Sequence, residues 1–114
     1  MDSNVDNIKA QMRKGVLEYC ILSILKNNDA YASSIIAELK DARMIVVEGT
    51  LYPLLTRLKN QGLLNYRWEE STQGPPRKYY SLTVKGQEAL AEMDIAWIEV
   101  VKSIEFVKSK KLPL

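Results

Sequence analysis

The side chains with the clearest binding chemistry in this sequence are polar residues between positions 50 and 60. Leu51, Leu54 and Leu58 recur there at helical spacing, so the polar residues occupy the opposite face of one predicted helix. From such a face, arginine donates two hydrogen bonds to a guanine edge, asparagine pairs with adenine, and lysine contacts phosphate. The candidate DNA-contacting residues are Thr50, Tyr52, Thr56, Arg57, Lys59 and Asn60. A helix with one polar face is most often only a surface helix, so this prediction depends on its surroundings.

A second group of candidate contacts follows in a short basic stretch. Between Arg57 and Tyr79, five basic residues stand against two acidic ones, which leaves a local charge of +3. Glycine allows a close approach of the backbone to a partner, prolines stiffen a turn, and cations bind phosphates. The residues of this group are Gln73, Gly74, Arg77 and Lys78.

Hydrophobic periodicity predicts the elements that position both groups. Helices are expected over about residues 5–26, 31–41 and 49–61, and strands over 63–68 and 77–82. Asp29 and Thr83 are predicted N-caps, and Gly62 is a suitable residue to close the third helix. The predicted fold class is mainly α with a β-hairpin wing. A winged helix-turn-helix over 1–82 precedes a long C-terminal dimerisation helix over 83–114, in one compact unit. In such a fold, one helix enters the major groove of DNA.

The last helix carries an apolar stripe with steps of three and four residues, which is a coiled-coil pattern. The stripe consists of Leu90, Met93, Trp97, Val100, Ile104 and Val107. An earlier stripe, Val5, Ile8 and Met12, also lacks a partner within so short a chain. A second copy of the chain would cover both stripes, so the sequence predicts a two-fold homodimer with these nine residues at its interface.

The composition excludes several other classes of function. Histidine is absent and Cys20 is the only cysteine, so the commonest general base and metal ligand are missing. We expect no enzymatic activity, no cofactor and no metal. Cys20 lies in an apolar run and is expected to be a small buried residue, with a redox sensor as the minor alternative. No run is apolar enough to span a bilayer and the N-terminus lacks a secretory pattern, which predicts a cytoplasmic protein without membrane contact.

The chain resembles the PadR family of transcriptional regulators, in its compact subfamily with one C-terminal helix. The most specific matching stretches are Thr50-Leu51-Tyr52-Pro53-Leu54-Leu55 and Gly74-Pro75-Pro76-Arg77-Lys78-Tyr79-Tyr80. The resemblance implies a winged-helix homodimer, usually a repressor, on an inverted-repeat operator. It also implies that the C-terminal helix packs against the partner's N-terminal helix. Val47 departs from the Ser, Thr or Pro common at the start of the third helix, which leaves the N-cap of that helix open.

The resemblance further implies a pocket at the dimer centre, where a tryptophan stacks on flat aromatic or cationic ligands. The residues that would line it are Met12, Gly15, Tyr19, Ala96 and Trp97. The alternative is that Trp97 is interface core without a ligand. Asp94 and Glu99 would favour a cation if their side chains face inward.

A different class of function also stays open at this stage. A winged-helix module that binds protein and not DNA would tolerate neutralisation of Arg57, Arg77 and Lys78. The basic hairpin favours DNA as the partner.

Overall fold

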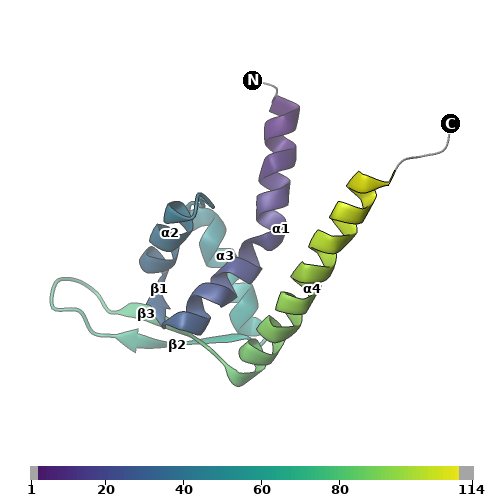
Figure 1. The fold of residues 1–114 in the computed structure, drawn as a ribbon. Helices are drawn as coiled ribbons and strands as arrows, with labels where there is room; N and C mark the ends of the chain where they lie inside the picture. The colour runs from purple at the N-terminus through teal and green to yellow at the C-terminus, as the bar shows by residue number, and fades with distance from the viewer. Residues whose placement is uncertain (1–2, 111–114) are drawn as a thin grey trace.

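The computed structural model describes residues 3–110 as a small winged-helix body from which two long helices project (Figure 1). In chain order the elements are α1 (Ser3–Asn27), β1 (Ala30–Tyr31), α2 (Ala32–Asp41), α3 (Glu48–Asn60), β2 (Leu64–Glu69), β3 (Arg77–Leu82) and α4 (Val84–Ser109). The predicted fold class is confirmed, and the first three helices and both predicted strands lie within one or two residues of their expected ends. The last helix also begins where expected but ends at Ser109, and the final residues of its predicted segment, 111–114, lie outside the described residues. The two-residue strand β1 was not predicted.

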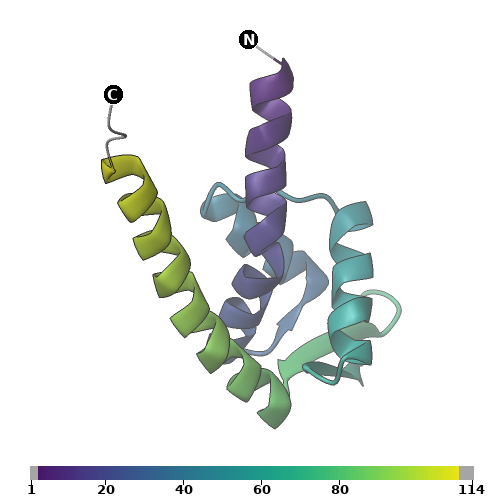
Figure 2. The ribbon, with the colours of Figure 1, turned by 90° about the vertical axis from the view of Figure 1, so that its right-hand side faces the viewer.

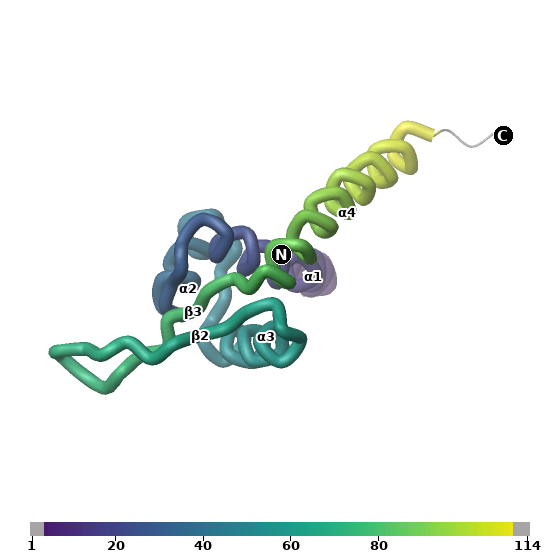
Figure 3. Tube along the Cα trace, turned by 90° about the horizontal axis from the view of Figure 1, so that it is seen from below, coloured from purple at the N-terminus to yellow at the C-terminus, as the bar shows by residue number. Residues whose placement is uncertain are grey.

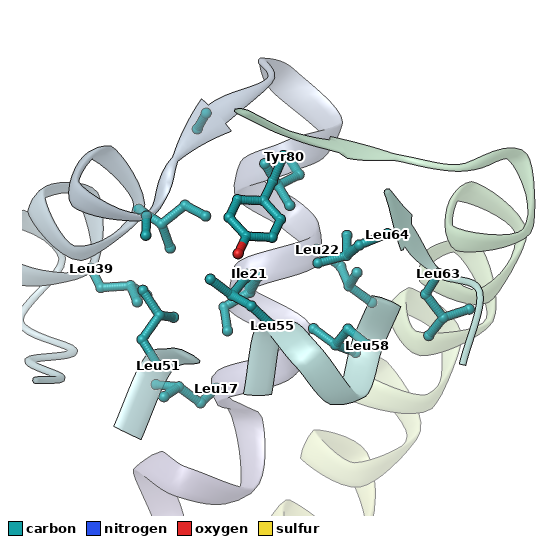
Figure 4. Packing of buried hydrophobic residues seen from close by; sticks show 14 of the residues in the cluster. Leu17, Ile21, Leu22, Leu39, Leu51, Leu55, Leu58, Leu63, Leu64 and Tyr80 are labelled. Carbon is teal, nitrogen blue, oxygen red and sulfur yellow. The ribbon is translucent and has the colours of Figure 1, made fainter. Parts of the chain in front are cut away.

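The core lies where the second half of α1, α2 and α3 meet one face of the sheet (Figure 4). Its fully buried side chains include Ile21, Leu39 and Leu55, one from each helix. Leu64 and Tyr80 close it from the sheet side. This packing fixes α3 by its leucine face and leaves the polar face of that helix in solvent.

β3 is the central strand of the sheet, antiparallel to β1 on one side and to β2 on the other. The paired positions that matter below are Tyr31 with Tyr79, Arg67 with Tyr79, Tyr66 with Tyr80, and Trp68 with Lys78. Because side chains alternate along a strand, Tyr66, Trp68 and Lys78 share the core-side face with Tyr80. Arg67, Arg77 and Tyr79 therefore lie on the other face.

Two predicted caps differ in their outcome. Thr83 caps α4 as expected, since its Oγ1 accepts a hydrogen bond from the backbone N–H of Gly86 at 2.9 Å. The N-cap prediction for Asp29 is wrong: Tyr31 holds the N-cap position of α2, without a side-chain hydrogen bond. Because β1 occupies Ala30 and Tyr31, the N-cap position lies two residues after Asp29, and Asp29 contacts Arg67 instead. Val47 occupies the N-cap of α3, also without a side-chain bond.

The junction between the wing and α4 is tightly packed. Gly62 ends α3 with a φ of 80°, the left-handed conformation that glycine adopts readily. Gly86 is buried in the first turn of α4, and a Cβ there would fall on the carbonyl oxygen of Leu63 and 2.7 Å from Cδ1 of Leu82. The direction of α4 is therefore set by direct backbone contact with the wing.

The N-terminal half of α1 and the C-terminal half of α4 project from the same side of the body (Figure 1 and Figure 2). From below, the hairpin and α4 point to opposite sides (Figure 3). Exposure rises along α4 from 2% at Leu90 to 72% at Val107. Leu90 therefore belongs to the core of its own chain. The α4 stripe enters the body at that point, so Leu90 already has apolar partners within its own chain, and its place at a dimer interface stays a prediction.

Candidate nucleic-acid interface

The six candidate residues on α3 are all exposed, as expected of a face turned away from the core. Four of them line one shallow depression on the helix, together with Pro53 and Gln61: Tyr52, Thr56, Arg57 and Asn60. Thr50 and Lys59 lie outside it. The depression contains an arginine, an amide and a hydroxyl, which are groups that hydrogen-bond to base edges.

Arg57 is already engaged in the free protein. Its Nη2 forms an ion pair with Oε1 of Glu18 on α1, a contact between two helices that residue patterns do not predict. Both side chains are partly exposed, so the pair contributes only about 0–1 kcal/mol. Arg57 can therefore leave Glu18 for a stronger anionic or guanine partner at low cost.

The second basic side chain with carboxylate partners is Arg67 on β2. Its Nε donates to Glu69 at 2.8 Å, and its Nη1 lies 3.4 Å from a carboxylate oxygen of Asp29. The hydrogen bond to Glu69, and after it the one to Asp29, raise the pKa of the Arg67 guanidinium. Its charge is thus compensated within the protein.

Three basic residues of the region remain: Lys59, Arg77 and Lys78. Within residues 3–110, none of them has a carboxylate partner at ion-pair distance. Lys59 of α3 and Lys78 of the wing lie 5.5 and 4.6 Å from the centre of the same ring, Tyr66. Two of the three uncompensated cations, one from the helix and one from the wing, therefore lie beside one aromatic ring, whereas Arg77 lies over Tyr31.

Aromatic residues that the sequence analysis did not select also belong to this surface. Trp68 is 61% exposed, and its ring lies 5.6 Å from Nζ of Lys78. It lines a groove of about 370 Å³ between the wing and the first turns of α2 and α3, which Tyr31, Tyr52 and Arg77 also line. Strand alternation marks the face on which Trp68 lies. The position of Tyr31 depends on β1, which is too short to show a pattern.

Gln73 and Gly74 lie in the exposed turn of the wing. The backbone N–H of Gln73 donates to Oγ of Ser71 at 3.3 Å. A Cβ on Gly74 would meet nothing within 4 Å, so the free protein imposes no steric need for glycine there.

A separate groove of about 570 Å³ runs between α1 and α4. All five residues predicted for a pocket line it: Met12, Gly15, Tyr19, Ala96 and Trp97. The Tyr19 and Trp97 rings lie 6.2 Å apart at 42°, and the Tyr19 hydroxyl donates to Asp94 at 2.6 Å. That hydrogen bond raises the pKa of Tyr19. Asp94 thus faces the hydroxyl beside the groove, whereas Glu99 is exposed.

The remaining predicted interface residues form two open apolar surfaces. Val5, Ile8 and Met12 are exposed on α1, as are Trp97, Val100, Ile104 and Val107 on α4, whereas Met93 is partly buried. Trp97 is 44% exposed, an unusual fraction for so large an apolar side chain.

Comparison with known proteins agrees with this architecture. A sequence model of the transcriptional regulator PadR-like family matches residues 21–92, from the buried half of α1 through the wing to the start of α4. The chain belongs to the PadR-like family. This family consists of transcriptional regulators and not of enzymes, and its members bind DNA.

Solved PadR-like structures are similar over nearly the whole chain. A PadR-like transcription factor from Bacteroides fragilis is 61% identical, with 89% of this chain and 98% of that one covered and a TM-score of 0.76. A PadR family regulator from Eggerthella lenta is 31% identical, with 96% of each chain covered and a TM-score of 0.90. A PadR-like regulator from Bacillus cereus is 36% identical, with 89% and 99% covered and a TM-score of 0.76. Among the described residues of this PadR-like chain, no helix is long and apolar enough to cross a membrane.

Proposed function

We propose that this protein is a sequence-specific DNA-binding repressor that acts as a homodimer on an inverted-repeat operator. The observation that carries the proposal is the distribution of charge. Two of the five basic residues between Arg57 and Tyr79 have carboxylate partners, and the other three lie on α3 and the wing without one in the described chain. A cluster of uncompensated cations beside an exposed polar helix is suited to phosphates flanking a major groove.

In this proposal α3 reads the bases and the wing binds the backbone. Thr56 and Asn60 lie together on the exposed face of α3, where an amide can pair with adenine and a methyl group can pack on thymine. Lys59, Arg77 and Lys78 bind phosphates and set the register without reading sequence.

The dimer is proposed from the two open apolar surfaces. The exposed stripes of α1 and α4 project from the same side of the body, so a second copy can cover them together. We infer that α4 packs against the partner's α1, with residues 83–114 as the dimerisation segment. Two recognition helices would then meet half-sites about one helical turn apart.

A small hydrophobic or aromatic effector is proposed for the groove between α1 and α4. Tyr19 and Trp97 offer aromatic faces there, and Glu18 is the one charged residue among the described groove residues. A ligand in this groove would weaken DNA binding if it binds better to a dimer whose recognition helices are wrongly separated.

Fluorescence anisotropy with DNA from the gene's own upstream region, against a scrambled duplex, tests the DNA-binding proposal. We expect selective binding to the upstream DNA. The logarithm of the association constant should fall steeply with the logarithm of the salt concentration. Arg77→Ala and Lys78→Ala should each weaken binding to both duplexes and reduce the salt slope by about one. Equal, weak binding to both duplexes, unaffected by these changes, would favour the protein-interaction alternative.

Tryptophan fluorescence tests the effector proposal. The chain has two tryptophans, so Trp68→Phe leaves Trp97 as the only one. We expect a planar aromatic dye to quench Trp97 saturably and to release operator DNA from the unsubstituted protein. Quenching without release would contradict the regulatory role of the groove.

A further inference from the structure

A row of aromatic and cationic side chains in contact with one another crosses the outer face of the sheet, with its two tyrosine rings tilted by 58°. The guanidinium of Arg77 lies 4.0 Å from the centre of the Tyr31 ring, which lies 4.8 Å from the Tyr79 ring. The guanidinium of Arg67 lies 4.6 Å from that same Tyr79 ring. Tyr31, Tyr79 and Arg67 are direct neighbours across β1, β3 and β2, so the strand register itself builds the row.

The arginines at the two ends of the row differ in whether a carboxylate compensates their charge. Arg67 is bound by Asp29 and Glu69, and the Asp29 contact ties the segment before β1 to β2. Arg77 has no such carboxylate within residues 3–110. The row therefore has one end tied to the body through Asp29, and an uncompensated cation at the other end, where the strands of the wing meet its turn.

Stacking leaves the hydrogen-bonding groups of Arg77 available. A guanidinium stacks through its flat faces, whereas its five N–H donors point outward in its plane. Tyr31 thus restricts the rotamers of a long side chain without occupying its donors. A side chain ordered in advance loses less entropy when it binds a phosphate.

We propose that Tyr31 is a positioning residue for DNA binding, which holds the Arg77 guanidinium in the orientation that meets a phosphate. This inference rests on the proposed function, because it requires Arg77 to contact DNA. Tyr31 belongs to the helix-turn-helix body and Arg77 to the wing, so the stack also joins the two DNA-contacting parts. In the sequence they are 46 positions apart.

A double-mutant cycle in operator affinity tests the proposal. Tyr31→Leu removes the ring, and we expect binding about two- to fivefold weaker, the value of an exposed cation–π contact. Tyr31→Phe keeps the ring and should bind like the parent. In an Arg77→Ala background, Tyr31→Leu should have no further effect, which a general loss of structure would not produce. Circular dichroism and thermal unfolding check the fold of each variant.

Arg77→Lys probes the same stack without altering β1. It keeps the charge but lacks the planar group, so we expect a loss similar to that of Tyr31→Leu. Parent-like binding by Arg77→Lys, or an undiminished effect of Tyr31→Leu in the Arg77→Ala background, would overturn the proposal. Equal losses for Tyr31→Phe and Tyr31→Leu would assign the effect to the hydroxyl and overturn it too.

The outcomes separate this inference from the proposed function. Loss of binding in Arg77→Ala with a fully active Tyr31→Leu protein would refute the positioning role alone. Arg77→Ala binding as tightly as the parent would refute the wing contact and the positioning role together.

Discussion

At the scale of single residues, Arg57 has two competing partners. Sequence patterns predict it as a base-reading residue, whereas in the free protein it pairs with Glu18 on α1. The two roles are compatible because an ion pair at a partly exposed site is weak. A bidentate contact with guanine is worth about 1–3 kcal/mol and would replace it.

Arg57→Ala should therefore weaken operator binding by roughly 1–3 kcal/mol and relax the preference for one base pair. Competition anisotropy with single-base operator variants measures both effects. A loss of the same size on operator and scrambled DNA would refute base reading by Arg57.

Glu18→Gln should have the opposite effect. Without the carboxylate, Arg57 needs no release before it contacts DNA, so we expect up to about fivefold tighter operator binding. In an Arg57→Ala background the gain should shrink. A gain that persists there would mean that Glu18 acts by general repulsion of DNA and not through the ion pair.

At the scale of elements, the junction of α3, the wing and α4 is held by backbone contacts that tolerate no added atom. The carbonyl oxygen of Leu63 accepts a hydrogen bond from the N–H of Thr83 at 3.1 Å, so it cannot easily move away from Gly86. Gly86→Ala would place its methyl group on that oxygen. Glycine is required there by the close approach of two backbones.

Gly86→Ala should destabilise the fold by about 1–3 kcal/mol, the usual cost of overpacking. Gly49→Ala on α3 is the matched control, because a Cβ there meets nothing within 4 Å. Urea unfolding followed by circular dichroism measures both variants. Equal stabilities would show that the junction adjusts to the methyl group.

Local patterns were sufficient to predict most elements but not the contacts between them. Leucine spacing located α3, and Thr83 marked the start of α4. Asp29 was misassigned because a two-residue strand has no periodicity, and its true partner, Arg67, lies 38 positions away. The pairs Glu18 with Arg57 and Tyr31 with Arg77 depend on helix packing and strand register, which one sequence does not specify.

At the scale of the whole molecule, the chain leaves two apolar helical surfaces open. Monomeric proteins rarely expose apolar patches of this kind without a partner. Association through them would add to stability, so thermal unfolding should shift upward with protein concentration. The core around Ile21 and Leu55 would stabilise the fold of each copy. The projecting halves of α1 and α4 would hold the two copies together.

Val100→Glu should dissociate the proposed dimer. Val100 is 48% exposed at the middle of the α4 stripe, where a buried charge would lack a partner. Val84→Glu is the matched control, because Val84 is exposed in the first turn of the same helix and far from the stripe. Light scattering that still reports a dimer for Val100→Glu would move the interface elsewhere.

The contact at Gly86 holds the base of α4, so a small change of angle there displaces the far end of the helix. The helix has 26 residues, and at about 1.5 Å per residue it is about 39 Å long. A rotation of about 5° at its base therefore moves its far end by about 3 Å. In a dimer joined through α4, the packing beside Gly86 would set the direction of α4 and therefore the distance between the two recognition helices. Substitutions there would change the operator spacing that the protein accepts, without altering any residue that contacts DNA.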